Sequence, residues 1–219
     1  MKKYLEVLYT CPLFEGIAEE NLLRMLNCLG ARVVFFDKKY TVLAEGTPGK
    51  FIGIVLSGEV VMSTTDFYGN RHIVTNARSG EMFGEAFACA QAESIPVSVI
   101  AAKASEVMFI DSSHILHTCE NNCGFHQQLI FNLMRSLAVK NLQFHQKIEI
   151  TSRRSTREKL LAYLTFYAKK ADSRSFSLPF DRQELADYLC VERSGLSAEI
   201  GKLKREGVIN ADKNHFELL

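Results

Sequence analysis

The chain has 219 residues, 47% of them hydrophobic, which suits one large domain or two small ones with an apolar core. Its formal net charge of +1 excludes a general polycation that holds anions by bulk charge alone. It has no apolar run of about 18 residues, and its N-terminus lacks the apolar stretch of a signal peptide. We therefore expect a cytoplasmic protein with no membrane span.

Short strands are predicted after a brief helical segment. In residues 10–29, leucines recur at helical spacing. Residues 31–110 are β-branched and aromatic runs separated by glycine-containing turns, typical of an antiparallel sandwich or barrel. The strongest hairpin tip is Tyr68–Asn70, because glycine and asparagine tolerate positive φ.

The period becomes helical after Ser112. We expect a short helix over Ser113–Asn121 and one long helix over Phe125–Ile150, about 39 Å at 1.5 Å per residue. Coiled-coil spacing, broken by a polar Lys140, predicts a dimer interface through this helix. Its expected contact residues are Ile130, Leu133, Leu137 and Phe144. The alternative is a long helix packed on its own β domain.

A helical hairpin is predicted over Phe180–Ile209. Asp181 has the position of an N-cap, with Glu184 at the spacing of a capping box. The second helix, about Arg193 to Arg205, turns its leucines and isoleucine inward, which favours a helix-turn-helix. The hairpin alone also fits an αα-hairpin in another kind of domain. A predicted β-hairpin over Ile209–Leu219 favours the winged form.

The order of parts resembles the CRP/FNR family of bacterial transcription regulators. The motifs that carry the resemblance are IVLSGEVVM, SGEMFGEA and DRQELADYLCVERSGLSAEIGKLKREGVI. The resemblance implies an α+β fold with three parts: an antiparallel, jelly-roll-like β-roll in 1–112, a dimerisation helix in 113–150 and a winged helix-turn-helix in 151–219. It implies a homodimer that binds palindromic double-stranded DNA, contacts RNA polymerase if it activates, and is not an enzyme.

The expected effector site departs from the family pattern. Family members that bind cyclic nucleotides have a Gly-Glu pair and, after it, an Arg-Ser pair that holds the cyclic phosphate. Gly84 and Glu85 match the first pair, but Ile95 and Pro96 stand at the second. A phosphate without its arginine would be desolvated and unpaired, so we expect neither cyclic AMP nor cyclic GMP. Gly84 and Glu85 then form either a ligand contact or a structural turn.

Cysteines and histidines leave the cofactor unknown. The six cysteines have no disulfide-framework spacing, and we expect reduced thiols. Cys11 and Cys28 are too sparse for the cysteine-rich motif of the family's iron–sulfur branch. A metal or haem site remains open around Cys119 and Cys123, with His114, His117 and His126 as the nearby histidines. The alternative for these cysteines is a small buried apolar residue.

Carried over from the family motif, Arg193 and Ser194 open the DNA-reading helix. Arg193 is the expected base reader, since a guanidinium pairs with O6 and N7 of guanine. Ser197 lies on the same face, and Ala198 stands where the family often has a second arginine. The candidate phosphate contacts are Arg182, Lys202 and Lys204. For the lysines, the alternative is a solvated surface.

The sequence bears on three possible functions: a DNA-binding regulator, a sensor module and an enzyme. A DNA-binding regulator explains every predicted part of the chain. A sensor module that has lost DNA binding is the alternative, permitted by Ala198 and a mild basic excess after residue 150. No nucleophile-elbow, zinc-protease or P-loop motif is present, which disfavours an enzyme.

Overall fold

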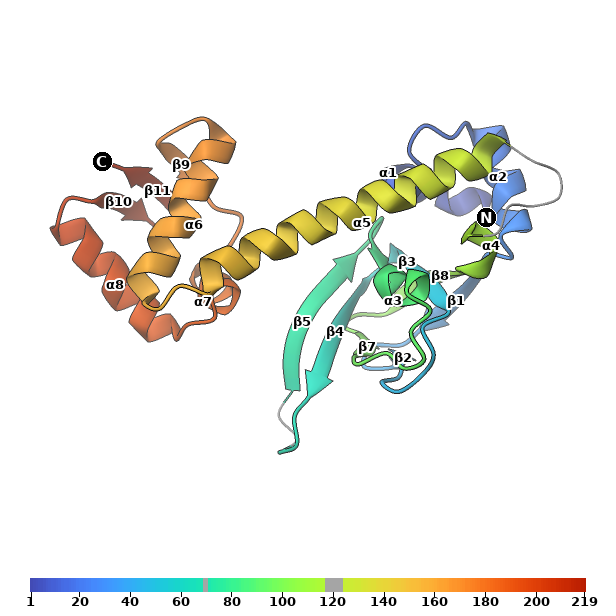
Figure 1. Ribbon diagram of the computed structural model, residues 1–219, viewed down its shortest axis with the longest axis horizontal. Coiled ribbons are helices and arrows are strands. Elements are labelled where there is room, and N and C mark those ends of the chain that lie inside the picture. The colour runs from blue at the N-terminus through green and yellow to red at the C-terminus, as the bar shows by residue number, and fades with distance from the viewer. Residues whose placement is uncertain (69–70, 117–123) are drawn as a thin grey trace. The chain divides into compact units, whose positions relative to one another are not determined.

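A computed structural model describes residues 1–68, 71–116 and 124–219 (Figure 1). The chain divides into two compact units, Met1–Val139 and Lys140–Leu219. The division falls within the long helix α5, Gly124–Thr151, so this helix contributes to both units. None of the helices in the described ranges is both long and apolar enough to cross a lipid bilayer.

Eight short strands form the β-roll of the first unit, which confirms the expected antiparallel α+β architecture. One sheet has the order β1-β8-β3-β6 and the other β2-β7-β4-β5, and every pair is antiparallel. The strands are β1 Arg32–Phe36, β2 Thr41–Leu43, β3 Phe51–Ser57, β4 Glu59–Thr65, β5 Arg71–Arg78, β6 Met82–Phe83, β7 Ser98–Ala101 and β8 Ser105–Asp111. The sequence did not predict β6, which has two residues.

Strand β3 is buried on both faces of its sheet. Its five central residues are all buried, so its sequence is a continuous apolar run rather than an alternation. Inside the roll, the Phe83 ring lies against Gly53, where a Cβ atom would come within 2.2 Å of the ring. Ile52 and Ile54 point the other way, into a second apolar core.

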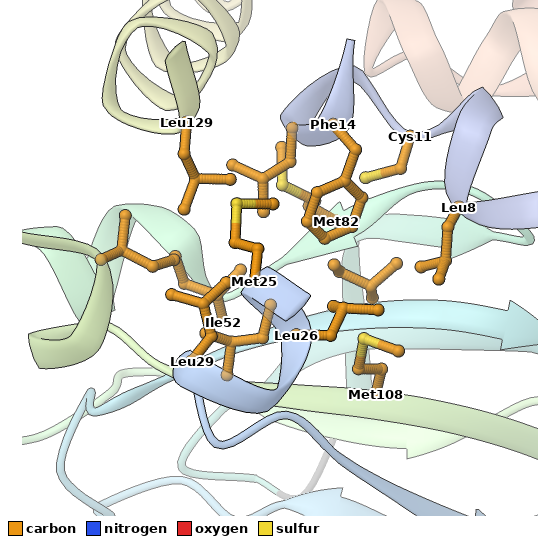
Figure 2. Packing of buried hydrophobic residues seen from close by; sticks show 14 of the residues in the cluster. Leu8, Cys11, Phe14, Met25, Leu26, Leu29, Ile52, Met82, Met108 and Leu129 are labelled. Atoms are coloured by element: carbon orange, nitrogen blue, oxygen red, sulfur yellow. The ribbon is translucent and has the colours of Figure 1, made fainter. Parts of the chain in front are cut away.

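The second core joins the sheet to helices before and after it. Figure 2 shows Leu8, Leu26 and Leu129 converging on Ile52 and Met108. The N-terminal elements are η1 Lys2–Tyr4, α1 Leu5–Thr10, η2 Pro12–Phe14 and α2 Glu19–Cys28. The sequence predicted a helical segment only from residue 10, so η1 and α1 are additions.

A buried asparagine fixes α5 to the N-terminal segment. Asn132 is 2% exposed, and its Nδ2 donates to the carbonyls of Leu13 at 3.0 Å and Glu15 at 2.8 Å. Gln128 donates to its Oδ1 at 2.9 Å. The polar group is therefore satisfied although it is buried, and the bonds orient this face of α5 toward the roll's own helices.

Two further helices complete the roll unit: α3, Glu85–Cys89, and α4, Ser113–Leu116. The short helix expected over Ser113–Asn121 therefore starts as predicted, and its part beyond Leu116 lies outside the described residues. The same holds for Gly69 and Asn70 of the predicted hairpin tip.

The second unit is a winged helix-turn-helix. Its elements after α5 are α6 Thr156–Ala171, β9 Ser175–Ser177, α7 Arg182–Leu189, α8 Arg193–Arg205, β10 Ile209–Asp212 and β11 His215–Leu218. The strands form an antiparallel sheet in the order β10-β11-β9. Ile150 at the end of α5 belongs to its core. Tyr163 is 3% exposed, and burial raises the pKa of its phenol.

Candidate nucleic-acid interface

Helix α7 begins with the predicted capping box. Asp181 Oδ1 accepts from the Glu184 amide at 2.8 Å, and Glu184 Oε2 accepts from the Asp181 amide at 2.8 Å. Two amides at the start of the helix are thus satisfied by carboxylates, which also complement the positive end of the helix dipole. The box fixes where α7 starts and therefore where the hairpin turns.

The turn between α7 and α8 is left-handed at a residue that is not glycine. Cys190 has φ 52° and ψ 57°, and its side chain is exposed. Lys159 of α6 donates from Nζ to the carbonyls of Leu189 and Cys190, each at 3.3 Å. This lysine satisfies carbonyls that the end of α7 leaves open.

Helix α8 has two distinct faces. Leu196, Ile200 and Leu203 are at most 5% exposed and pack in the core of the unit, as the periodicity predicted. The opposite face is exposed and carries the residues expected to contact DNA at the start of the helix. These are Arg193, Ser194, Ser197 and Ala198. The helix thus presents one guanidinium and two hydroxyls to a partner.

Arg182 is held more firmly than a free phosphate contact. Its Nη2 donates to the Lys213 carbonyl at 2.9 Å, and its guanidinium lies over the Phe216 ring, 5.5 Å from the centroid. Burial, with the nearby charge of Arg193, lowers the pKa of Arg182. Arg182 therefore fastens α7 to the wing, and its Nη1 is buried with no hydrogen-bond partner among the described residues.

The two candidate lysines of α8 are both engaged within the unit. Lys202 Nζ lies 3.6 Å from Glu199 Oε2, and Lys204 Nζ donates to the Ala211 carbonyl at 2.8 Å. Exposed interactions of this kind are weak and can exchange for a phosphate. They show that Lys204 has a role in fixing the wing strand β10, which sequence reasoning did not predict.

Sequence reasoning missed Lys213. This exposed lysine stands at the turn of the wing with φ 51°, and its carbonyl holds Arg182. The predicted β-hairpin over Ile209–Leu219 was the available signal, since a basic residue at the tip of a wing beside the DNA-reading helix is a candidate phosphate contact. Basic side chains near the DNA-reading helix thus come from α7 (Arg182), from α8 itself (Arg193) and from the turn of the wing (Lys213).

In the roll unit, the two expected effector residues lie at the start of helix α3, where Gly84 is half-buried and Glu85 is buried. Gly84 has φ 75° and caps helix α3, and Glu85, the first residue of that helix, is 4% exposed. Ile95 is 3% exposed and lines a small cavity with Gly84. The position that would hold a phosphate-binding arginine is therefore part of an apolar wall.

Solved regulators share this architecture across nearly the whole chain. The Catabolite Activator Protein of Thermus thermophilus is 20% identical over 95% of this chain and 93% of its own, with a TM-score of 0.51. The c-di-GMP responsive regulator CLP of Xanthomonas campestris is 16% identical over 90% and 98%, with a TM-score of 0.59. DNR from Pseudomonas aeruginosa is 20% identical over 100% and 95%, at 0.52. At these identities the likeness is one of fold.

Two family models match the sequence itself. A cyclic nucleotide-binding domain matches residues 33–122, and a Crp-like helix-turn-helix domain matches residues 158–219. The chain belongs to the CRP/FNR family. Members of this family are transcription regulators that bind DNA as dimers, and they are not enzymes. No curated protein sequence matches the chain significantly.

Within this CRP/FNR architecture, α5 presents a different face from the one the spacing indicated. Leu133 is 2% exposed and lies in the core of its own roll, where Ile130 and Leu137 also pack. Because Asn132 turns this face toward the N-terminal segment, Leu133 is not available to a partner helix. Phe144 is 54% exposed and remains available.

The cofactor hypotheses for this CRP/FNR chain rest largely on residues that are not described. Cys119, Cys123 and His117 lie outside the described residues. His126 is buried and its Nε2 bonds the His114 carbonyl at 3.1 Å, while His114 Nδ1 bonds the Leu29 carbonyl at 3.0 Å. Among the described side chains, no group of three potential ligands is placed to hold a metal ion.

Proposed function

We propose that this chain forms a homodimer that binds palindromic promoter DNA through α8, under the control of an effector that the β-roll senses. The observation that supports it best is the exposed face of α8. A guanidinium and two hydroxyls, from Arg193, Ser194 and Ser197, point away from a helix whose other face is fully packed. A helix so placed fits the major groove, where phosphate contacts position it and base contacts give specificity.

Arg193 is the proposed base reader. It is exposed in the first turn of α8, at the end of the helix that helix-turn-helix proteins direct at base edges. A guanidinium there can donate two bonds to O6 and N7 of one guanine. Ala198 offers only a methyl group to the next position, so its contact would be apolar, for example with the methyl group of a thymine.

The proposed dimer interface lies on the outward face of α5. Phe131, Met134 and Leu142 are 55%, 59% and 70% exposed, and with Ala138 they follow steps of three, four and four residues along one face. Exposed apolar side chains in such a row are expected to pack against the same row of a second copy. A dimer built this way would read two half-sites about one helical turn apart.

Two further parts of the proposal concern partners and the alternative. A regulator that activates would also contact RNA polymerase, which in vitro transcription with and without the protein would reveal. The competing function is a sensor module with weak or lost DNA binding. The engagement of Arg182, Lys202 and Lys204 within the unit favours this alternative, because it reduces the free basic charge beside α8.

Binding of purified full chain to promoter fragments, measured by gel shift at several salt concentrations, separates the two functions. We expect specific binding whose affinity falls steeply with salt. Arg193→Ala should lose roughly 1–3 kcal/mol of discrimination at one base pair of each half-site. Arg24→Ala, which removes an exposed arginine from α2 in the other unit, is the matched control. DNA binding that does not depend on salt or on sequence contradicts specific recognition by α8. Unchanged base selectivity in Arg193→Ala contradicts the role of Arg193 as the base reader.

A further inference from the structure

A cavity lies in the roll between helix α3, the loop of residues 46–50, and strands β4 and β7. Its free volume is about 10 Å³, room for roughly one water molecule. Its lining is formed by Leu43, Pro48, Gly49, Lys50, Phe51, Met62, Gly84, Phe87, Ile95, Val97 and Val99. Lys50 is the single charged residue of this lining, and the rest are apolar side chains or glycines.

Three backbone amides beside the cavity donate to backbone carbonyls. The Ile95 amide donates to the Thr47 carbonyl at 2.8 Å, and the Gly46 amide donates to the Ile95 carbonyl at 3.0 Å. The Gly49 amide donates to the Ala92 carbonyl at 2.8 Å. The loop and the segment after α3 are thus tied together, and these amides are not offered to a phosphate.

A charged ligand would therefore be poorly solvated here. It would lose its hydration and meet mainly carbon atoms, with Lys50 exposed at the edge as its one cation from the lining. An apolar ligand loses nothing by the same transfer and gains contact with Phe51 and Met62. The lining of the cavity therefore favours an apolar ligand over a charged one.

We propose that the effector of this roll is a small, uncharged and largely apolar molecule, about the size of a single aromatic ring. This inference rests on the proposed function, since it names the ligand class of the same sensor. The ligand would take the space of the Phe87 ring. Phe87 is half-buried and is carried by α3, a helix of five residues.

Displacement of Phe87 would also reach the loop. Gly49 lies so close to Phe87 that a Cβ at position 49 would come within 2.8 Å of the Phe87 carbonyl oxygen. A shift of α3 is therefore felt by the loop of residues 46–50, which is bonded to the segment that follows α3. Ligand entry would move this whole corner of the roll.

Toluene, a neutral ring without hydrogen-bonding groups, is the probe. Binding to the full chain is measured by saturation-transfer NMR and by the thermal unfolding of the protein, with cyclic AMP in parallel. We expect toluene to bind and cyclic AMP to have no effect. Phe87→Ala should bind toluene about tenfold more tightly, because it opens an apolar cavity. Ile95→Arg with Pro96→Ser should weaken toluene binding by at least about tenfold, since it places a charge in the wall.

Phe67→Ala is the matched control, because Phe67 is 97% exposed in the same unit and does not line the cavity, so its truncation removes an aromatic ring without opening a buried space. It should leave toluene affinity unchanged. The proposal is overturned if toluene binds neither wild type nor Phe87→Ala, if both cavity variants bind it as wild type does, or if cyclic AMP stabilises the wild type. DNA binding is measured on the same samples. DNA binding without toluene binding overturns this inference alone, and toluene binding without DNA binding overturns the proposed function alone.

Discussion

The candidate DNA-binding site and the candidate effector site differ in whether their hydrogen-bond donors are exposed. On α8, Arg193, Ser194 and Ser197 stand exposed above a packed apolar face. In the roll, the amides of Ile95 and Gly49 bond to neighbouring carbonyls, and apolar side chains line the remaining space. One unit leaves donors open to a partner, and the other has satisfied them internally.

The difference in exposure indicates whether the protein must rearrange when each site binds its partner. An exposed guanidinium on a fixed helix is pre-positioned, so a partner meets it without rearranging the protein. An apolar cavity of only about 10 Å³ admits a ligand larger than water only if a side chain moves. We expect the DNA-binding unit to act as a rigid reader and the roll to change conformation when its ligand enters.

The largest effect on DNA binding is expected from disrupting the proposed dimer interface. Phe131→Glu with Met134→Glu places charges in the proposed interface on α5 and should yield monomers. DNA affinity should then fall by about 100-fold or more, because two half-sites are no longer bound together. Sedimentation velocity and gel shift measure the two effects.

The control for this pair is Ile73→Glu on β5, which adds the same charge to an exposed apolar residue of the roll, 70% exposed. It should remain dimeric and bind DNA as wild type does. A dimer that survives both glutamates moves the interface to another face of the molecule and removes the proposed row on α5.

The structure of the winged helix-turn-helix unit, Lys140–Leu219 (the reading unit), was largely predictable from the sequence. Capping by Asp181 and the inward residues of α8 depend on neighbours in the chain, which local spacing reveals. The packing of one face of α5 on its own roll depends on residues far along the chain. Leu133 and Leu137 have coiled-coil spacing, but Asn132 bonds to carbonyls near residue 14, more than a hundred positions away.

The cavity in the roll was predictable only in part. The replacement of the arginine by Ile95 was visible in the sequence, and it correctly indicated an apolar position. The bonds that join residues 46–49 to residues 92–95 depend on the closure of two sheets, which no local pattern encodes. Strand β6 escaped prediction for the same reason.

Helix caps provide a smaller test within the reading unit. Asp181 and Ser155 cap α7 and α6 with the same reciprocal bonds. Alanine at either position should lower the stability of Lys140–Leu219 by about 1 kcal/mol. Chemical denaturation followed by hydrogen exchange on peptides of each unit measures this. Peptides of the roll should not change, and a change there would show that the two units unfold together.

A half-buried carboxyl group of the roll, that of Glu59, should make part of the roll's stability depend on pH. Glu59 lies 2.9 Å from Lys103 and also bonds Asn76 and Arg78, and these contacts, Lys103 foremost, lower the pKa of its carboxyl group. The lowered pKa means that its contribution is present above the pKa of an unfolded glutamate and lost as pH falls through the folded value. Because Lys103 and Arg78 are exposed, the contribution should stay below about 1 kcal/mol.

Glu59→Gln tests this contribution. The variant should unfold at lower urea than wild type at neutral pH, and the two should converge as pH falls below the lowered pKa of Glu59, where both side chains are uncharged. Lys38→Gln, which removes an exposed charge with no resolved interaction of this kind, should leave the difference between the two pH values unchanged. A Glu59→Gln difference that is constant with pH would assign the effect to packing instead of charge.

The smallest expected effect, that of Cys190→Gly, concerns a left-handed backbone conformation that occurs in both units. Gly84 in the roll and Cys190 in the reading unit both have left-handed φ, 75° and 52°. A Cβ in this region costs roughly 1 kcal/mol or more, and glycine's extra freedom in the unfolded chain returns part of the difference. Cys190→Gly should therefore stabilise its unit by about 0.5 kcal/mol, whereas Gly84→Ala should destabilise the roll by about 1 kcal/mol.

Cys190→Ala separates strain from the thiol, because it keeps the Cβ atom and removes only sulfur. It should leave stability near that of wild type in thermal unfolding, while Cys190→Gly rises. Equal stability of the glycine and alanine variants would mean that Lys159, which bonds the carbonyls of Leu189 and Cys190, already compensates the strain. Combining Cys190→Gly with Lys159→Met resolves this, since glycine should then recover more stability than it does beside the lysine.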